Sequence, residues 1–493
     1  MNVEKEIIQE ALKLRVDTAE KLNAIKRHVL RSAKGTKKIP NTAVLLQAYH
    51  KLLKENKIKR SEQLEKVLTK RAVRTLSGVS IITVLTKPFP CPGECIYCPN
   101  EKTMPKSYLA DEPAAARALA LHFDPYEQVA RRVSALEANG HPTDKIELIV
   151  KGGTWNAHPL EYQYWFILRC FMACDFLPHT SILSSLRKHG SNAPQKEKKI
   201  PAFAGMTTSE LKKQLIKTQQ RNERAPHRIV GLTLETRPDH INEQNILIMR
   251  ELGCTRIELG VQTIDNKILK LIKRGHDAKE IARATALLKN YGFKVDYHLM
   301  PQLPGSTPKK DLQMLEEIFS NSEYRPDMIK IYPCTVVDNS ELYEWLKAKK
   351  YKPYSDRNLI EVIKKFKAQI PRYVRVSRVI RDIPAHHIKA GNTMTNLRQV
   401  IQAEMAKEGL KCKCLRCREV GHIQTNFQLP ISNFQLRLYI EKYKASGGTE
   451  YFLSFENPKR QVVYAFCRLR VNTPVIPPYL VGGIQKNKTL DSR

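Results

Sequence analysis

Six strand-like runs that alternate with helix-like segments constrain the fold of this chain more than any other feature. The apolar, β-branched runs cover residues 81–85, 145–150, 229–234, 255–259, 294–300 and 328–332. Helical spacing of apolar residues lies between them, over residues 114–139, 160–176, 242–252, 278–289 and 310–319. Alternating β and α elements predict a parallel sheet with right-handed crossovers. Six strands favour an α/β fold built as an open, partial (β/α)6 barrel over a closed eight-stranded one.

A loop rich in glycine, proline or polar residues follows each predicted strand. Because the chemistry of α/β barrels gathers at the carboxyl ends of the strands, we expect one shared site there. The pair Gly152-Gly153 would let the backbone approach a small ligand, although an ordinary strand-to-helix turn would account for the two glycines as well. Glu235 and Arg237 offer an acceptor and a cation, either for a ligand or for a structural ion pair. His298 is assigned no role, because a core histidine fits equally well.

The first of these loops holds Cys91, Cys95 and Cys98 in the spacing C-x3-C-x2-C. Soft thiolates that converge from one loop suit a polynuclear iron centre. A zinc knuckle would lack a nearby fourth ligand, a disulfide would leave one cysteine over, and three unrelated cysteines are the remaining alternative. The loop therefore predicts a [4Fe-4S] cluster whose fourth iron is open to a substrate or cofactor.

A second cysteine group, Cys412, Cys414 and Cys417, lies far downstream in a basic stretch. The spacing C-x-C-x2-C predicts a closed structural zinc site once a fourth ligand folds in, with a second iron–sulfur cluster as the alternative. The candidates for the fourth ligand are His422, Cys334 and Cys467.

The chain is strongly basic, with 83 Lys and Arg against 49 Asp and Glu and a formal net charge of +34. Such an excess indicates a polyanionic partner, most commonly nucleic acid, although general basicity or an anionic membrane would also account for it. Cations dominate residues 21–74, which overlap a helix predicted over residues 2–32. We therefore expect residues 1–77 to form a basic helical region that follows a phosphate backbone.

Membrane insertion is not expected. The amino terminus opens with acidic residues rather than a signal sequence, and the apolar stretch 164–177 is interrupted by Arg169 and Asp175. We expect a soluble, cytoplasmic protein without a membrane partner. Residues 177–226 lack periodicity and are interpreted as a mobile surface insertion with no catalytic part.

Taken together, the motifs closely resemble one branch of the radical S-adenosylmethionine (AdoMet) enzymes, namely the catalytic subunit of Elongator and its single-chain bacterial and archaeal relatives. The resemblance covers most of residues 10–470 outside the insertion. It rests on Cys91 to Pro99, Phe123 to Gln128, Lys151 to Thr154, Gly231 to Asp239, Glu258 to Thr263, Arg381 to Pro384, Asn396 to Arg398, Cys412 to Glu419 and Ala445 to Glu450.

The resemblance implies cofactors and contacts. The open iron would chelate AdoMet, and reductive cleavage would give a 5′-deoxyadenosyl radical. The loop Gly152, Gly153 and Thr154 would contact the methionyl amine, and Glu235, Arg237 and Gln262 are AdoMet candidates for the ribose or carboxylate. Lys145 matches a lysine of the family that contacts acetyl-CoA. No catalytic side chain is identified.

The resemblance also implies an acyltransferase-class enzyme that forms 5-carboxymethyluridine at the wobble position, uridine 34, of tRNA. The radical would take hydrogen from the acetyl methyl group of acetyl-CoA, and the acetyl radical would add to C5 of the uridine. An unpaired anticodon loop would be the recognised partner. An electron donor is required, and a homodimer is left open.

Four regions are expected: the basic helices over 1–77, the radical AdoMet partial barrel over 78–370, a cysteine-rich linker over 371–430 and an incomplete acetyltransferase-like segment over 431–493. Because the chain ends soon after residues 464–470, we expect a truncated acetyltransferase-like fold. The alternative functions are a tRNA-binding, AdoMet-cleaving protein without acetyl transfer, and a radical AdoMet enzyme with another substrate.

Overall fold

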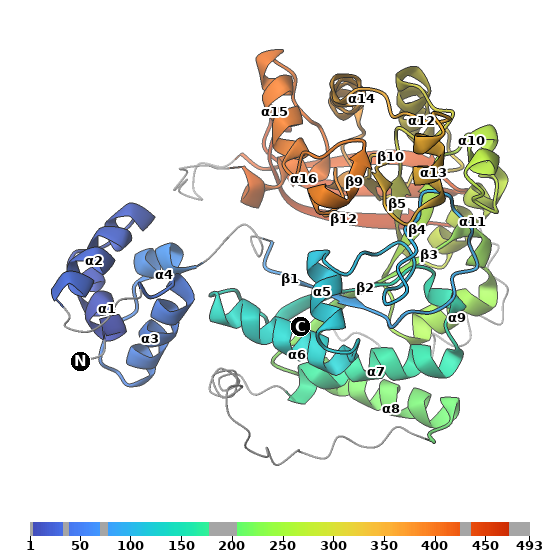
Figure 1. Cartoon of the computed structure of the whole chain (residues 1–493). Helices are drawn as coiled ribbons and strands as arrows, with labels where there is room; N and C mark the ends of the chain where they lie inside the picture. The colour runs from blue at the N-terminus through green and yellow to red at the C-terminus, as the bar shows by residue number, and fades with distance from the viewer. Residues whose placement is uncertain (1–2, 33–38, 70–76, 177–204, 424–434, 473–493) are drawn as a thin grey trace.

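The computed structural model describes residues 3–32, 39–69, 77–176, 205–423 and 435–472 (Figure 1). Its first four helices, α1 (Val3–Lys13), α2 (Ala19–Ser32), α3 (Thr42–Lys54) and α4 (Glu62–Leu68), share an apolar core of their own. The single helix predicted over residues 2–32 is wrong. Arg15 is left-handed (φ 48°), and the Thr18 hydroxyl accepts a hydrogen bond from the Lys21 amide at 3.3 Å, which caps a new helix.

Seven parallel strands form the central sheet, and their spatial order follows the chain. Six of them coincide with the predicted runs, which confirms the partial α/β barrel. The seventh, β8, escapes prediction because its four residues include two arginines and a serine. The strands are β1 (Ser80–Leu85), β2 (Lys145–Lys151), β3 (Arg228–Thr236), β4 (Arg256–Gln262), β5 (Lys294–Leu299), β6 (Met328–Ile331) and β8 (Arg375–Arg378).

The inner strands alternate between an apolar face and a polar face. Ile257 and Leu259 of β4 pack in the main core with helix residues such as Leu288, whereas Glu258 faces the other way. This alternation leaves polar side chains along the inner face of the half-barrel. The connecting helices are α5 (Pro113–Leu119), α6 (Pro125–Ala138), α7 (Leu160–Phe176), α8 (Thr208–Asn222), α9 (Glu243–Glu251), α10 (Asn266–Leu271), α11 (Ala278–Asn290), α12 (Pro308–Ser320), α13 (Glu341–Lys347) and α14 (Asp356–Gln369).

Two predictions about connections need correction. The helix predicted over residues 114–139 is divided into α5 and α6, because His122 and Phe123 are left-handed and Asp124 caps α6 through the Glu127 amide at 3.0 Å. The second half of the interpreted insertion is also regular. Thr207 and Glu210 form a capping box for α8, whose buried Leu211 and Leu215 join the main core. The first half, residues 177–204, lies outside the described residues.

The C-terminal part is packed onto the barrel (Figure 1). The antiparallel strands β10 (Arg437–Ala445), β11 (Gly448–Glu456) and β12 (Val463–Val471) contribute Phe452 to the main core. Lys289 of α11 lies 3.3 Å from Glu450, and buried Arg418 lies 2.7 Å from buried Glu456. The remaining elements are α15 (Leu397–Lys407), α16 (Leu415–Arg418), the small ribbon of β7 (Val336–Val337) and β9 (Ile388–Ala390), and the short helices η2 (Trp155–Ala157), η5 (Pro238–His240), η6 (Ala385–His387) and η7 (Val420–His422).

None of the helices in the described ranges combines the length and the apolar character that crossing a bilayer requires.

Candidate functional site

The three-cysteine loop follows β1 at the carboxyl edge of the sheet. Cys95 is buried, and its sulfur lies 3.2 Å from Nη1 of Arg274 and 4.0 Å from Nη1 of Arg237. Cys95 and Cys98 share a hydrogen bond, while the Cys91 sulfur lies 3.7 Å from Oγ1 of Thr154. The cysteines thus face the loops of β2, β3 and β4 rather than solvent alone.

This surrounding favours a thiolate. The hydrogen bond from Cys98, together with the cations of Arg274 and Arg237, lowers the pKa of Cys95 to about 4 against the opposing effect of burial. The same hydrogen bond and burial raise the pKa of Cys98. Because thiolates are the ligands of iron–sulfur clusters, one loop that offers three cysteines beside two buried arginines fits such a cluster.

The double glycine behaves differently at its two positions. Gly152 has φ 133°, and a Cβ there would lie 2.0 Å from Oγ1 of Thr86, so protein packing alone requires glycine. Gly153 has φ 93°, and a Cβ there would meet only the Lys106 carbonyl oxygen, at 3.7 Å. The open side of Gly153 is therefore the part of this turn that a ligand could approach.

Glu235 and Arg237 point to different partners. The Tyr108 hydroxyl donates to Glu235 Oε2 at 3.1 Å, and Lys151 Nζ lies 3.2 Å from the same oxygen. Arg237 pairs with Asp239 at 2.8 Å and donates to the Arg274 carbonyl at 2.7 Å. Both side chains thus take part in protein ion pairs.

Gln262 ends β4 with φ 71°, and its buried Oε1 atom has no hydrogen-bond partner among the described residues. A buried carbonyl oxygen without a donor is costly unless a ligand or water satisfies it. The inner face at the end of β4 therefore has capacity for one more donor.

A buried polar layer lies on the inner face and was not identified from the sequence. The strand register places Glu235 beside Glu258 and Glu258 beside Asp296. Lys151 and Lys330 both pair with Glu258, and His298 Nε2 lies 2.9 Å from Glu258 Oε2. The three carboxylates, two lysines and one histidine thus come from five adjacent strands.

The layer holds groups with displaced pKa values. Burial opposes ionisation of Glu258, but Lys151 and Lys330 hold its pKa well below the ordinary value. Burial lowers the pKa of Lys330 to about 8 and also lowers the pKa of His298. Burial raises the pKa of Asp296 to about 7, and neither carboxylate oxygen has a hydrogen-bond partner in the described chain. Groups poised near neutrality in one layer are typical of a reaction site.

A sequence signal for this layer does exist. Lys330 interrupts Met-Ile-Lys-Ile, and Asp296 and His298 alternate with Val295, Tyr297 and Leu299. Polar residues at every second position of a central strand predict an inward face that is not apolar core.

Arg381 joins its own segment to the loop that follows the three cysteines. Arg381 lies 2.7 Å from Glu112 Oε1 and 3.2 Å from Ser107 Oγ, and its guanidinium lies over the Tyr108 ring at 4.9 Å. Because Tyr108 also donates to Glu235, these contacts of Arg381 hold the loop around Tyr108 against the inner face of the half-barrel.

The second cysteine trio is brought together as predicted. The sulfurs of Cys412, Cys414 and Cys417 all lie within 4.8 Å of one another, a spacing that fits a single tetrahedral zinc ion. The buried ammonium of Lys367 has no hydrogen-bond partner among the described residues, and the three thiols raise its pKa against the opposing effect of burial. A cation beside three thiolates compensates their charge, so the donor set fits zinc.

None of the three expected fourth ligands joins this trio in the described chain. His422 lies 3.7 Å from Glu419, and buried Cys334 packs with Tyr351 in another cluster. Cys467 is exposed on β12. The identity of the fourth ligand therefore stays a prediction.

Lys145 lies away from the cysteines. It is exposed at the start of β2, whereas Lys151 at the end of that strand reaches Glu258. Six residues of strand separate the two by about 20 Å. Its expected contact with acetyl-CoA stays a prediction.

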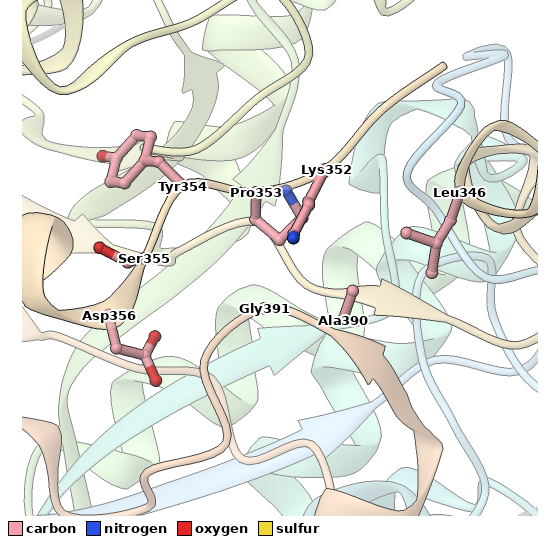
Figure 2. A pocket seen from close by; sticks show the side chains of 8 residues that line it. All are labelled: Leu346, Lys352, Pro353, Tyr354, Ser355, Asp356, Ala390 and Gly391. Atoms are coloured by element: carbon pink, nitrogen blue, oxygen red, sulfur yellow. The ribbon is translucent and has the colours of Figure 1, made fainter. Parts of the chain in front are cut away.

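A surface pocket of about 320 Å³ opens elsewhere, beside β9 (Figure 2). None of its eight lining residues is a predicted site residue. They are Leu346, Lys352, Pro353, Tyr354, Ser355, Asp356, Ala390 and Gly391.

Comparison with known families and proteins gives consistent matches. The radical SAM superfamily model matches residues 195–318, and the radical SAM C-terminal domain model matches residues 326–407. The chain is 45% identical over 410 residues to a tRNA uridine(34) acetyltransferase of Methanocaldococcus infernus, covering 82% of this chain and 71% of that protein. It is 33% identical to human Elongator complex protein 3 over 82% of this chain and 69% of that protein.

Among solved structures, the archaeal Methanocaldococcus infernus Elp3 with an N-terminal deletion is similar, with a TM-score of 0.66 and 41% identity. The match covers 81% of this chain and 80% of that chain.

Proposed function

This chain belongs to the Elongator complex protein 3 family of radical AdoMet enzymes, and from that membership we propose that it modifies uridine 34 of tRNA. The observation that carries the proposal is the three-cysteine loop at the carboxyl edge of a half-barrel whose inner face is polar. A purely structural barrel would fill that face with apolar side chains.

Cys91, Cys95 and Cys98 would hold the [4Fe-4S] cluster, and the loop from Gly152 to Thr154, with Glu235, Arg237 and Gln262, would surround AdoMet. Bound together, cluster and AdoMet supply a 5′-deoxyadenosyl radical. Arg274 and Arg237 keep the Cys95 sulfur anionic, which favours metal binding at that corner. The second trio, Cys412, Cys414 and Cys417, would hold a structural zinc ion.

The inner layer would orient the substrate. Lys151 lies between Glu235 and Glu258, so these two carboxylates hold its ammonium in place at the carboxyl end of β2. Asp296 keeps a proton up to about pH 7 and can donate a hydrogen bond that an ordinary aspartate cannot. A uracil ring presents carbonyl acceptors suited to such donors, and an unpaired anticodon base would approach them from the carboxyl edge of the sheet.

We propose that the specific reaction at uridine 34 is the formation of 5-carboxymethyluridine from acetyl-CoA. Support comes from the family and from the antiparallel strands β10 to β12, which agree with the first strands of an acetyltransferase-like fold. The basic helices α1 to α4 would carry the tRNA, and an external electron donor would reduce the cluster.

Nucleoside analysis tests the proposal. Anaerobically reconstituted protein is incubated with unmodified tRNA, AdoMet, a reductant and acetyl-CoA, and the digested tRNA is examined by mass spectrometry. We expect 5-carboxymethyluridine at position 34 with the wild type and none with Cys95→Ser. Release of 5′-deoxyadenosine without modified uridine would favour AdoMet cleavage without acetyl transfer, and absence of both products would refute the assignment.

A further inference from the structure

Two adjacent histidines and an aspartate from a distant segment converge outside the site described above. Nε2 of His386 and Nε2 of His387 each lie 2.9 Å from Oδ2 of Asp111. All three ligand atoms lie within 4.8 Å of one another, and the two imidazole rings are 4.2 Å apart. The histidines belong to η6, and Asp111 lies just before α5.

From this geometry we propose that Asp111, His386 and His387 bind one divalent transition-metal ion of the zinc class. Two imidazole nitrogens and one carboxylate oxygen form a donor set that suits Zn²⁺, Ni²⁺, Co²⁺ or Fe²⁺ and does not suit Mg²⁺ or Ca²⁺. Three protein ligands leave the remaining coordination positions to water.

The distances permit the ion with little rearrangement. Ligands about 2.0–2.1 Å from a tetrahedral ion are about 3.3 Å apart, so each 2.9 Å contact opens by only a few tenths of an ångström. The side chains of His386, His387 and Asp111 are 68%, 27% and 41% exposed, so an ion can enter from solvent. The two imidazole rings are solvent-accessible and already contact the same Asp111 oxygen, so binding the ion would require little side-chain movement.

The surroundings fix the two halves of this site relative to each other. Arg381, five residues before His386, is bound to Ser107 and Glu112 on either side of Asp111. An ion bound here would add a second cross-link between the same two segments. Because Tyr108 lies in the clamped loop and donates to Glu235, the ion would strengthen the covering of the inner face.

Zinc uptake tests the proposal. Full-length protein with its cysteine sites loaded is dialysed against Zn²⁺, and bound metal per chain is counted. We expect one additional Zn²⁺ in the wild type and in His28→Ala, which removes an exposed histidine of α2. The double variant His386→Ala/His387→Ala should bind this ion more than about 100-fold more weakly, beyond the loss caused by a merely supporting residue.

Two further measurements keep the outcome decisive. Asp111→Asn preserves shape and hydrogen bonding, so it should fold and still lose the additional ion. Co²⁺ in place of Zn²⁺ should give a spectrum without the intense sulfur-to-metal band of a thiolate site. Equal uptake by wild type and double variant, displacement by Mg²⁺, or a thiolate band for the additional ion would overturn the proposal and leave a hydrogen-bonded cluster only.

Discussion

At the scale of single residues, Cys95 is the side chain on which the cofactor assignment depends most directly. Cys95→Ser removes the thiolate that Arg274 and Arg237 stabilise. We expect anaerobic reconstitution to give no stable cluster absorbance in this variant. The matched control is Cys254→Ser, which changes a buried thiol just before the amino end of β4, at the edge of the sheet opposite to the cysteine loop. This variant should retain the absorbance. A cluster of normal intensity in Cys95→Ser would contradict the assignment.

Asp296 gives a second residue-level prediction. Its pKa is raised by burial from an ordinary value of 3.8 to about 7, so between about pH 4 and pH 7 the folded chain holds a proton that the unfolded chain releases. Stability should therefore fall as pH rises through this window, by up to about 4 kcal/mol for the full shift. Asp296→Asn should remove that slope, as measured by urea unfolding at pH 5 and pH 8.

Asp327→Asn is the control with the opposite sign. Lys289 and Arg468 hold the pKa of Asp327 below its ordinary value despite burial, so its contribution is present above about pH 4 and is lost on acidification. Its replacement should cost about 3–5 kcal/mol at pH 8, as removal of one partner of a buried ion pair does. A pH slope that Asp296→Asn leaves unchanged would contradict the raised pKa of Asp296, and an Asp327→Asn variant as stable as the wild type at pH 8 would contradict the lowered pKa of Asp327.

At the scale of elements, the turn after β2 separates packing from ligand approach. Gly152→Ala meets Thr86 Oγ1 at 2.0 Å in addition to backbone strain, whereas Gly153→Ala meets only a carbonyl oxygen at 3.7 Å. We expect Gly152→Ala to destabilise the fold by about 2–4 kcal/mol and Gly153→Ala by about 1–2 kcal/mol. Thermal unfolding measures the difference, and equal losses would show that the Thr86 contact is unimportant.

The elements also show what the sequence can and cannot predict. The six strand positions were predictable because apolar runs and turn residues are local signals. The seventh strand was not, since Arg375-Val-Ser-Arg378 becomes a strand only by pairing with β6. The division at Asp124 carries a local signal, Asp-Pro, which favours a helix start and was outweighed by the apolar periodicity on both sides.

The candidate site divides in the same way. Spacing alone predicts both cysteine trios, and the structure brings the sulfurs of Cys412, Cys414 and Cys417 within 4.8 Å of one another. The pairing of Glu235 with Lys151, and of Glu258 with His298, depends on strand register and on side chains from separate strands, which no single stretch of sequence contains.

At the scale of the whole molecule, the net charge of +34 predicts a salt-sensitive complex with tRNA. Lys54 and Lys66 are exposed on α3 and α4, so replacing both by glutamine should weaken tRNA binding and reduce the slope of log K against log salt by roughly 1.4–1.8. The pair Lys213 and Lys217 on α8 is the charge-matched control. Filter binding over a salt series measures both, and equal slopes in the two variants would exclude a specific role for the N-terminal helices.

The ion pair between Arg418 and Glu456 has a consequence for dissecting this protein. A gene fragment that stops before residue 435 would leave the buried Arg418 guanidinium without its counter-charge, Glu456. It would also leave a cavity in the main core at the position of Phe452. Such a fragment should precipitate on expression rather than report on the barrel. The same contacts constrain evolution, because losing strands β10 to β12 would first require substitutions at Arg418 and at the core residues that pack against Phe452.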